Sequence, residues 1–176
     1  SETWFTSFDL YRSPELSYGI FNYEGESDAS LLTVPYTISG NNPALRFYHR
    51  YNTEAGNDGG FLEISVDNGL FTLIGKDKFL RNGYNSDLAY STLATPNLQS
   101  FSGNSGGDWQ DNLIGPWVES IIDLSEYKGK NVVFKFRFGS NLTVKGAGAI
   151  AGWFIDDFEI LDLFKYTSEA CIIADA

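Results

Sequence analysis

The amino-acid sequence predicts an all-β protein in which two antiparallel sheets pack face to face as a sandwich. Aromatic residues make up 16% of the 176 residues, and aromatic side chains favour strands. Short runs alternate apolar and polar residues with the period of a strand, and no stretch shows the period of an amphipathic helix. Clusters of Gly, Asn, Asp and Ser separate these runs as turns. The length suits one core, so we expect a single domain over residues 1–163 and a linker or tail over 164–176.

The first half of the chain contains five predicted strands. We expect them over residues 17–23, 31–34, 44–54, 61–66 and 70–74. The last two are joined by Asp67-Asn68-Gly69, which predicts a tight hairpin because Asn-Gly tolerates positive φ. The residues predicted to face the core from the third and fourth strands are Leu45, Phe47, His49, Tyr51, Leu62, Ile64 and Val66.

The second half begins with a long polar region. Residues 75–115 are rich in Gly, Ser and Asn, and we expect them to form loops, which at this length tend to be functional or mobile. Strands are predicted over 116–124, 131–139 and 152–161. The residues predicted to face the core from the 131–139 strand are Val132, Phe134, Phe136 and Phe138.

The last predicted strand carries one polar residue on an otherwise apolar face. Alternation groups Phe154, Asp156, Phe158 and Ile160, and this face is expected to point into the core. A carboxylate among core aromatics is too costly to leave alone. Asp156 is therefore expected to meet a cation, an arginine such as Arg46 or Arg50, or a set of N–H donors, and it is the first candidate site residue.

The charge of the chain excludes some partners. The net charge is −11 and the pI is about 4.4, so no basic stripe is available for nucleic acid. No run of eighteen apolar residues predicts insertion into a membrane. Cys171 is the single cysteine, so no internal disulfide can form. Because no signal-peptide pattern is present, we expect either a cytosolic chain or a mature or excised piece of an exported protein, and the lack of any Met favours the excised piece.

Three blocks of sequence carry a resemblance to a known family. They are residues 46–69, which include Asp58-Gly59-Gly60 and the predicted hairpin turn, residues 122–139, and residues 152–157. Their order and spacing resemble the MAM-like jelly-roll domains of large secreted bacterial proteins. Such domains accompany fungalysin-type and immune-inhibitor-A-type metallopeptidases and form the cleaved-adhesin modules of Bacteroidetes. The chain departs from the pattern at Phe71, where Trp is usual, and shows no clear opening strand before Trp4.

The resemblance implies a jelly-roll β-sandwich of eight to nine strands, an extracellular location, and no catalysis within the domain. It also implies a structural calcium ion, and in such jelly rolls an early acidic loop and an aspartate of a late strand close the calcium site. We therefore expect Asp156, Glu26 and Asp28 as ligands, with Asp157 as a substitute and Asp58 in the same or a second site. The family pattern further implies that Cys171 meets a partner beyond this segment.

A ligand surface is predicted on the outward side of the central strands. Alternation turns several rings and arginines outward there, and such a face suits a sugar or a peptide. The alternative is that these side chains form cross-strand ion pairs, such as Arg50 with Glu63, and have only a structural role. We favour this alternative over a ligand surface. Trp109, within the long polar region, is the aromatic most expected to contact a ligand. The outward set is Arg46, Tyr48, Arg50, Phe61, Glu63, Lys135 and Arg137.

Catalysis within the domain is not expected. His49 is the only histidine and is predicted on the apolar face, as a buried and hydrogen-bonded side chain. Zinc-peptidase sites need pairs of histidines, and a nucleophile–His site needs a partner that the sequence does not indicate. A glycosidase-type site with two carboxylates is still compatible with the sequence, but no pattern in the sequence indicates which two carboxylates would form it.

The sequence thus predicts a non-catalytic, calcium-stabilised accessory domain of a secreted or cell-surface protein. Its expected role is adhesion, or recognition of a glycan or an extracellular protein. A purely structural spacer beside a neighbouring peptidase domain is the alternative, and a jelly-roll enzyme acting on glycans is a third hypothesis.

Overall fold

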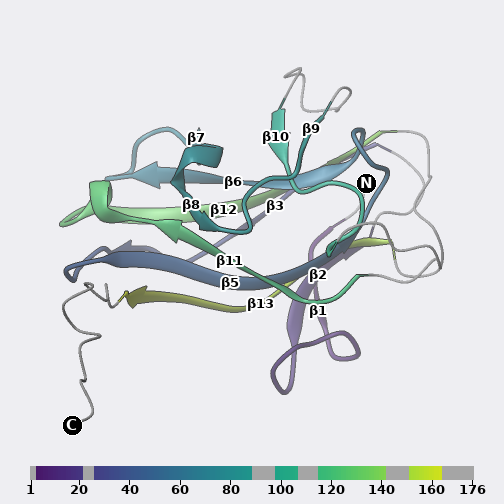
Figure 1. The fold of residues 1–176 in the computed structure, drawn as a ribbon, viewed down its shortest axis with the longest axis horizontal. Coiled ribbons are helices and arrows are strands. Elements are labelled where there is room, and N and C mark those ends of the chain that lie inside the picture. Colours follow the sequence, from purple (N-terminus) through teal and green to yellow (C-terminus); the bar gives the residue numbers. More distant parts are fainter. Residues whose placement is uncertain (1–2, 22–25, 89–97, 107–114, 142–150, 164–176) are drawn as a thin grey trace, which may run out of the picture.

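The computed structural model describes residues 3–21, 26–88, 98–106, 115–141 and 151–163, and it confirms the predicted all-β class (Figure 1). These residues contain thirteen strand segments, more than the eight or nine expected, because segments of two or three residues accompany the long strands. The strands are β1 (Phe5–Ser7), β2 (Ser17–Phe21), β3 (Ser27–Leu32), β4 (Tyr36–Thr37), β5 (Pro43–Asn52), β6 (Gly59–Val66), β7 (Thr72–Leu73), β8 (Phe79–Arg81), β9 (Ser86–Leu88), β10 (Leu98–Ser100), β11 (Val118–Asp123), β12 (Asn131–Ser140) and β13 (Gly152–Asp162).

Two antiparallel sheets form the layers of the sandwich. Sheet A has six strands in the order β1-β2-β13-β5-β11-β8. Sheet B has the order β3-β12-β6-β7, with β4 also paired to β12. Figure 1 shows β6 and β12 in one layer and β11, β5 and β13 in the other. A separate pair, β9 and β10, lies at one end.

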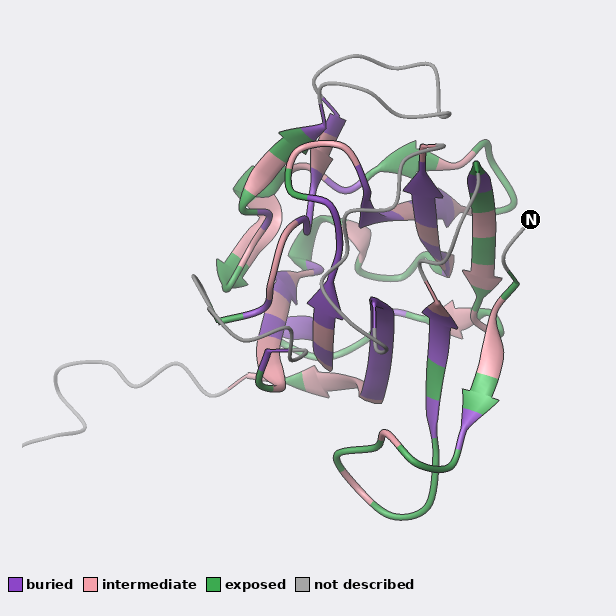
Figure 2. Cartoon of the chain, turned by 90° about the vertical axis from the view of Figure 1, so that its right-hand side faces the viewer, coloured by how far each residue is buried: buried purple, intermediate pink, exposed green. Residues whose placement is uncertain are grey.

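The core fills the space between the two sheets. The face of β5 predicted to be apolar supplies Leu45 and Phe47, and the predicted face of β12 supplies Phe134 and Phe136, all buried (Figure 2). The Phe47 and Phe136 rings meet edge to face with centroids 5.3 Å apart, and Phe136 lies 5.8 Å from Trp153 of β13. The alternation on β5 and β12 was therefore predicted correctly. On β6, Leu62 and Ile64 are buried as predicted, but Phe61, which was predicted to face outward, is buried as well and belongs to the core cluster.

The predicted hairpin is present at the end of sheet B. Asp67 and Asn68 both have positive φ, 49° and 63°, as a tight turn of mirror-image type requires. The returning strand is shorter than predicted, because only Thr72 and Leu73 pair with β6.

The prediction that residues 75–115 are loop was wrong for much of its described part. It contains a single turn of 3-10 helix (Lys76–Lys78) and β8, which pairs with β11 at the edge of sheet A. It also contains β9 and β10, which pair with each other. Each of these strands has only three residues, which is too short for a periodic signal in the sequence.

The predicted orientation of Asp156 was also wrong. On β13, Asp156 pairs with Tyr48 and Glu159 pairs with Arg46, so β13 has one residue more than β5 between these pairs. This is a β-bulge, and Asp157 has a φ of +48° within it. The extra residue reverses the alternation after the bulge, so Phe158 and Ile160 face the core together with Trp153 and Ile155. A strict period of two grouped Asp156 with Phe158 and therefore assigned it wrongly to the core. The core-facing residues of β13 are Trp153, Ile155, Phe158 and Ile160.

Candidate functional site

Asp156 lies on the outer side of sheet A, where it fastens the loop that joins β1 to β2. Its Oδ2 accepts hydrogen bonds from the backbone N–H groups of Arg12, at 2.7 Å, and Ser13, at 3.1 Å. Its Oδ1 accepts one from the backbone N–H of Asp157 at 2.7 Å. The Ser13 hydroxyl lies 3.4 Å from this oxygen but 2.5 Å from Oδ1 of Asp157, to which it donates its single proton. The side chain is only 8% exposed. The sequence left three kinds of partner open for Asp156: a cation, an arginine side chain or N–H donors. The structure shows N–H donors, and two of them belong to Arg12 and Ser13, in a segment for which no structure was predicted.

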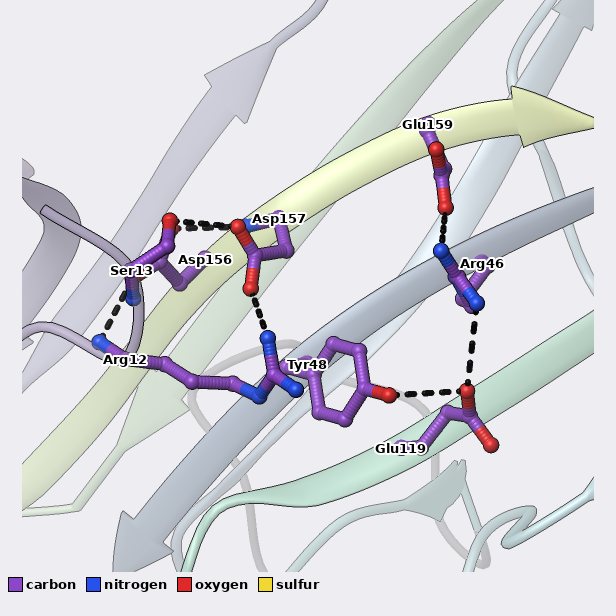
Figure 3. Close-up of polar contacts among 8 residues, drawn as sticks. All are labelled: Arg12, Ser13, Arg46, Tyr48, Glu119, Asp156, Asp157 and Glu159. Atoms are coloured by element: carbon purple, nitrogen blue, oxygen red, sulfur yellow. Dashed lines mark hydrogen bonds and ion pairs between the residues drawn. The ribbon is translucent and has the colours of Figure 1, made fainter.

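The fastened loop places Arg12 over β5. The Arg12 guanidinium lies 3.6 Å from the centroid of the Tyr48 ring and pairs with the carboxylate of Asp157 (Figure 3). The hydrogen bond to Asp157 raises the pKa of Arg12 above its ordinary value. Tyr48 in turn donates its hydroxyl to Glu119 at 2.9 Å. Burial, followed by this bond to a carboxylate, raises the pKa of Tyr48.

Glu119 and Arg46 complete the network on the neighbouring strands. Glu119 pairs with Arg81 and lies 3.7 Å from Arg46, which also pairs with Glu159 across the bulge (Figure 3). Partial burial alone would raise the pKa of Glu119, but hydrogen bonds from Arg81 and Tyr48 outweigh it and lower the pKa. The network therefore contains three arginines, Arg12, Arg46 and Arg81, and three carboxylates, Asp157, Glu119 and Glu159.

These side chains surround an open depression of about 470 Å³, which we call the outer hollow. It lies on the outer side of β5 and β13, beside the loop that Asp156 fastens. Its volume falls in the range of sites that hold small molecules or a few sugar units, of about 300–1,000 Å³. Its lining residues are Arg12, Ser13, Arg46, Tyr48, Asp157, Phe158 and Glu159.

The predicted ligand face is divided between two surfaces. β5 belongs to sheet A and β6 to sheet B, so Arg50 and Glu63 lie on different sheets and the predicted pair between them is wrong. The turn between β5 and β6 carries the chain from one sheet to the other. Arg46 and Tyr48 line the outer hollow, whereas Arg50 lies near Trp117, with 5.7 Å from its guanidinium carbon to the ring centroid.

On sheet B, Arg137 takes part in cross-strand pairing. It makes two hydrogen bonds of 2.8 Å to the two carboxylate oxygens of Asp28, and one of 3.4 Å to Glu63. The Asp28 bonds raise the pKa of Arg137. Lys135 pairs with Glu63 at 2.8 Å and covers the Phe71 ring. We call these pairs, Lys135–Glu63, Arg137–Asp28 and Arg137–Glu63, the ladder. The sequence favoured cross-strand ion pairs on this face, and the structure has them, although between other residues than Arg50 and Glu63.

The five residues predicted as calcium ligands lie in separate places. Asp156 and Asp157 are adjacent in the bulge, whereas Asp28 is on β3 with Arg137, and Glu26 is exposed just before β3. In the part of the chain that the structure describes, no three His, Cys, Asp or Glu side chains form a group suited to a metal ion. The oxygens of Asp156 already accept three backbone hydrogen bonds, so this residue does not fit as the centre of a calcium site.

Asp58 has a different environment, next to a carboxylate that the sequence did not single out. Asp58 is fully buried and Glu54 is 9% exposed, in the turn between β5 and β6. Asn141 connects them, since its backbone N–H donates to Asp58 at 2.8 Å and its side chain donates to Glu54 at 3.3 Å. Both side chains are carboxylates that bond to the same residue, Asn141, and carboxylate oxygens are donors that Ca²⁺ prefers.

His49 lies between the sheets and is buried and hydrogen-bonded, as predicted. The Trp153 indole N–H donates to its Nδ1 at 3.1 Å, so its proton is on Nε2, which lies 3.0 Å from the Ser120 hydroxyl. Ser120 donates onward to the carbonyl of Asn82. Burial lowers the pKa of His49 to about 3. Because Nε2 carries the proton, His49 cannot act as a base toward Ser120 in this arrangement.

Other predicted residues lie outside the described part of the chain. Trp109, the aromatic most expected to contact a ligand, is one, and Cys171 with the rest of residues 164–176 is another. The residues that sequence reasoning missed are Arg12, Ser13, Glu54, Glu119 and Glu159. Glu119 and Glu159 could have been found from strand alternation, whereas no sequence pattern linked the first two to Asp156.

Comparison with known proteins adds no relative: no family model and no curated protein matches this chain. Within the described residues, no helix has the length and apolar character needed to cross a membrane.

Proposed function

We propose that this chain is a non-catalytic recognition domain of a larger secreted or cell-surface protein, and that it binds a glycan in the outer hollow. The observation that carries the proposal is the set of planar polar groups around this depression. Arg46, Glu159 and Asp157 are held by ion pairs at fixed positions, and Tyr48 is held by its bond to Glu119. Such groups bind neighbouring hydroxyls of a sugar ring in pairs, and their preorganisation lowers the entropy cost of binding.

The role follows from the resemblance and from the geometry of His49. The single histidine is committed to Trp153 and Ser120, which supports a binding role over nucleophilic catalysis. A domain of this kind would serve adhesion or hold a neighbouring catalytic domain at a polysaccharide.

A panel of soluble polysaccharides and matrix proteins, followed by calorimetric titration of any positive member, tests the proposal. We expect saturable glycan binding that Arg46→Ala weakens at least about tenfold, because it removes a charged hydrogen-bond donor from the hollow. Arg137→Ala is the matched control, since it removes an arginine from the outer side of sheet B and should leave binding unchanged. Binding of matrix proteins alone would reassign the ligand. Absence of binding to the whole panel would contradict recognition and favour a structural spacer.

We also propose that calcium stabilises the fold through Glu54 and Asp58. A divalent cation would bind the carboxylate oxygens of both residues, and the ion would join the β5–β6 turn to the end of β12 at Asn141.

Thermal unfolding of the metal-free protein, with calcium added or with chelator, measures this contribution. If calcium binds only the folded state, a concentration of about 100 times Kd should add about 2.7 kcal/mol of stability. Asp58→Asn should abolish the shift, whereas Asp28→Asn, on the outer side of sheet B, should retain it. An equal melting temperature in calcium and chelator, with no calcium found by elemental analysis, would rule the ion out.

A further inference from the structure

One edge of β13 has no strand beside it along much of its length. β5 pairs with β13 from Gly152 to Asp162, whereas β2 pairs with it only from Gly152 to Ile155. Among the residues that the structure describes, no strand lies against positions 156–162 on the β2 side. In Figure 1, β13 continues to the left beyond β2. An edge of this kind presents backbone N–H and C=O groups that an extended peptide can pair with.

An apolar groove opens beside this edge, between sheet A and sheet B. It has a volume of about 380 Å³, and we call it the seam. Tyr18 shows that the seam is open: its strand position faces inward, opposite Ile155, yet its side chain is 47% exposed. A second depression of about 360 Å³ continues along Leu16 and Ser17 to the bulge. The side chains that line the seam include Tyr18, Leu31, Val34, Tyr36, Ile155 and Phe158.

The charge of the open edge of β13 indicates which kind of strand could pair with it. Positions 156–163 contain four carboxylates, Asp156, Asp157, Glu159 and Asp162, and no basic residue. Arg12 and Arg46 pair with Asp157 and Glu159, so the edge keeps an excess of negative charge from Asp156 and Asp162. Antiparallel pairing of β13 with β13 of a second copy would bring these like charges together, which is unfavourable across strands. The net charge of −11 opposes self-association further. A strand with basic residues on one side would instead meet these carboxylates, while apolar residues on its other side would enter the seam.

We propose that the open edge of β13 binds an extended segment of a partner protein in which apolar and basic residues alternate. The segment adds to sheet A as a strand. Its apolar side chains pack against Tyr18 and Phe158 in the seam, and its basic side chains lie near Asp157 and Glu159 on the outer side. This surface shares Asp157, Phe158 and Glu159 with the outer hollow, but the strand pairing itself does not depend on glycan binding.

The test uses the whole chain and a labelled peptide of about eight residues in which valine and lysine alternate, a usual length for a strand. Fluorescence anisotropy should show saturable binding, weakened about tenfold when NaCl rises from about 0.05 to about 0.5 M. A peptide with proline at two central positions should not bind, because proline cannot donate to the ladder. Hydrogen exchange should show that amides in 156–162 gain protection when the first peptide is added.

Matched tyrosine variants locate the site. Tyr18→Ser should weaken peptide binding at least about fivefold, because it removes an apolar wall of the seam. Tyr11→Ser is the control, since Tyr11 is similarly exposed, at 44%, and lies in the β1–β2 loop away from the seam. Equal effects of the two variants would overturn the proposal.

Other occupants would also overturn it. A dimer in light scattering that Tyr18→Ser dissociates would show that a second copy fills the edge. β5 already pairs with one side of β13, so only the amides in 156–162 that point to the β2 side are informative. If these amides are already protected in the monomeric chain without peptide, the chain's own residues fill the edge.

Discussion

The outer sides of the two sheets use the same residue types in different ways. On sheet B, Lys135, Glu63, Arg137 and Asp28 form a ladder of direct pairs along regular strands. On sheet A, Arg46, Glu159, Glu119 and Arg12 are joined through Tyr48 and Asp157 around a hollow. The first arrangement covers its sheet, whereas the second leaves space between its charges.

The difference originates in backbone regularity. β12 and β6 keep an unbroken register over Val132 to Gly139, so opposite charges meet directly or on the diagonal. β13 has its bulge opposite β5, and the β1–β2 loop binds there. Charged residues alone therefore do not indicate a binding surface; the bulge and the loop separate the hollow from the ladder.

The largest expected effect comes from removing the anchor of that loop. Asp156→Ala leaves the N–H groups of Arg12, Ser13 and Asp157 without their acceptor, and we expect it to lower the free energy of unfolding by about 3 kcal/mol. Asp28→Ala on sheet B should cost less than about 1 kcal/mol, because its pair with Arg137 is exposed. Urea unfolding of both variants compares them. If the two variants lost similar amounts of stability, anchoring the loop would stabilise the fold no more than an exposed ion pair does.

Acid should weaken the fold through His49 of sheet A. Burial lowers the pKa of His49 from 6.5 to about 3, so below pH 6.5 the unfolded chain takes up a proton that the folded chain does not. Stability from this group is complete above pH 6.5 and falls by up to about 1.4 kcal/mol per pH unit as the pH is lowered toward 3.

Unfolding free energies at pH values between 6.5 and about 4.5, above most carboxylate titration, measure this slope. His49→Phe should be less stable at neutral pH, since Trp153 and Ser120 lose a partner, but it should show a flatter slope. An unchanged slope in this variant would assign the acid sensitivity to other groups.

The smallest effect is expected from the ladder of sheet B. Arg137→Ala should lower stability by about 1 kcal/mol or less, and the loss should shrink in high salt because the Asp28 pair is screened. Thermal unfolding at low and high salt provides the measurement. A loss as large as that of Asp156→Ala, independent of salt, would show that the ladder supports the fold as strongly as the anchored loop.

The sequence predicted those parts of the structure that follow local periodicity. Phe47, Phe134 and Phe136 alternate regularly, and the Asp67-Asn68 turn has a strong local signal, so the core of β5, the core of β12 and the hairpin were all found. The environment of His49 was predicted for the same reason: its face of β5 is uniformly apolar.

The site depended on contacts between distant parts of the chain. Arg12 and Ser13 reach Asp156 across more than 140 positions, and no local pattern encodes that contact. The assignment of β5 and β6 to different sheets likewise follows from tertiary packing, so Arg50 and Glu63 were grouped wrongly. Asp156 was singled out correctly as unusual, but its orientation was wrong because an extra residue in β13 is invisible to a strict period of two.

That extra residue has a consequence for how the strand could be altered. If Asp157 were deleted, Trp153, Ile155, Phe158 and Ile160 would fall on one side of an uninterrupted strand, and the core would keep every side chain it has now. We therefore expect the interior to tolerate the loss of Asp157 without repacking. The interactions of this residue lie at the surface, where it bonds to Asp156 and Ser13 and its carboxylate positions Arg12 over Tyr48.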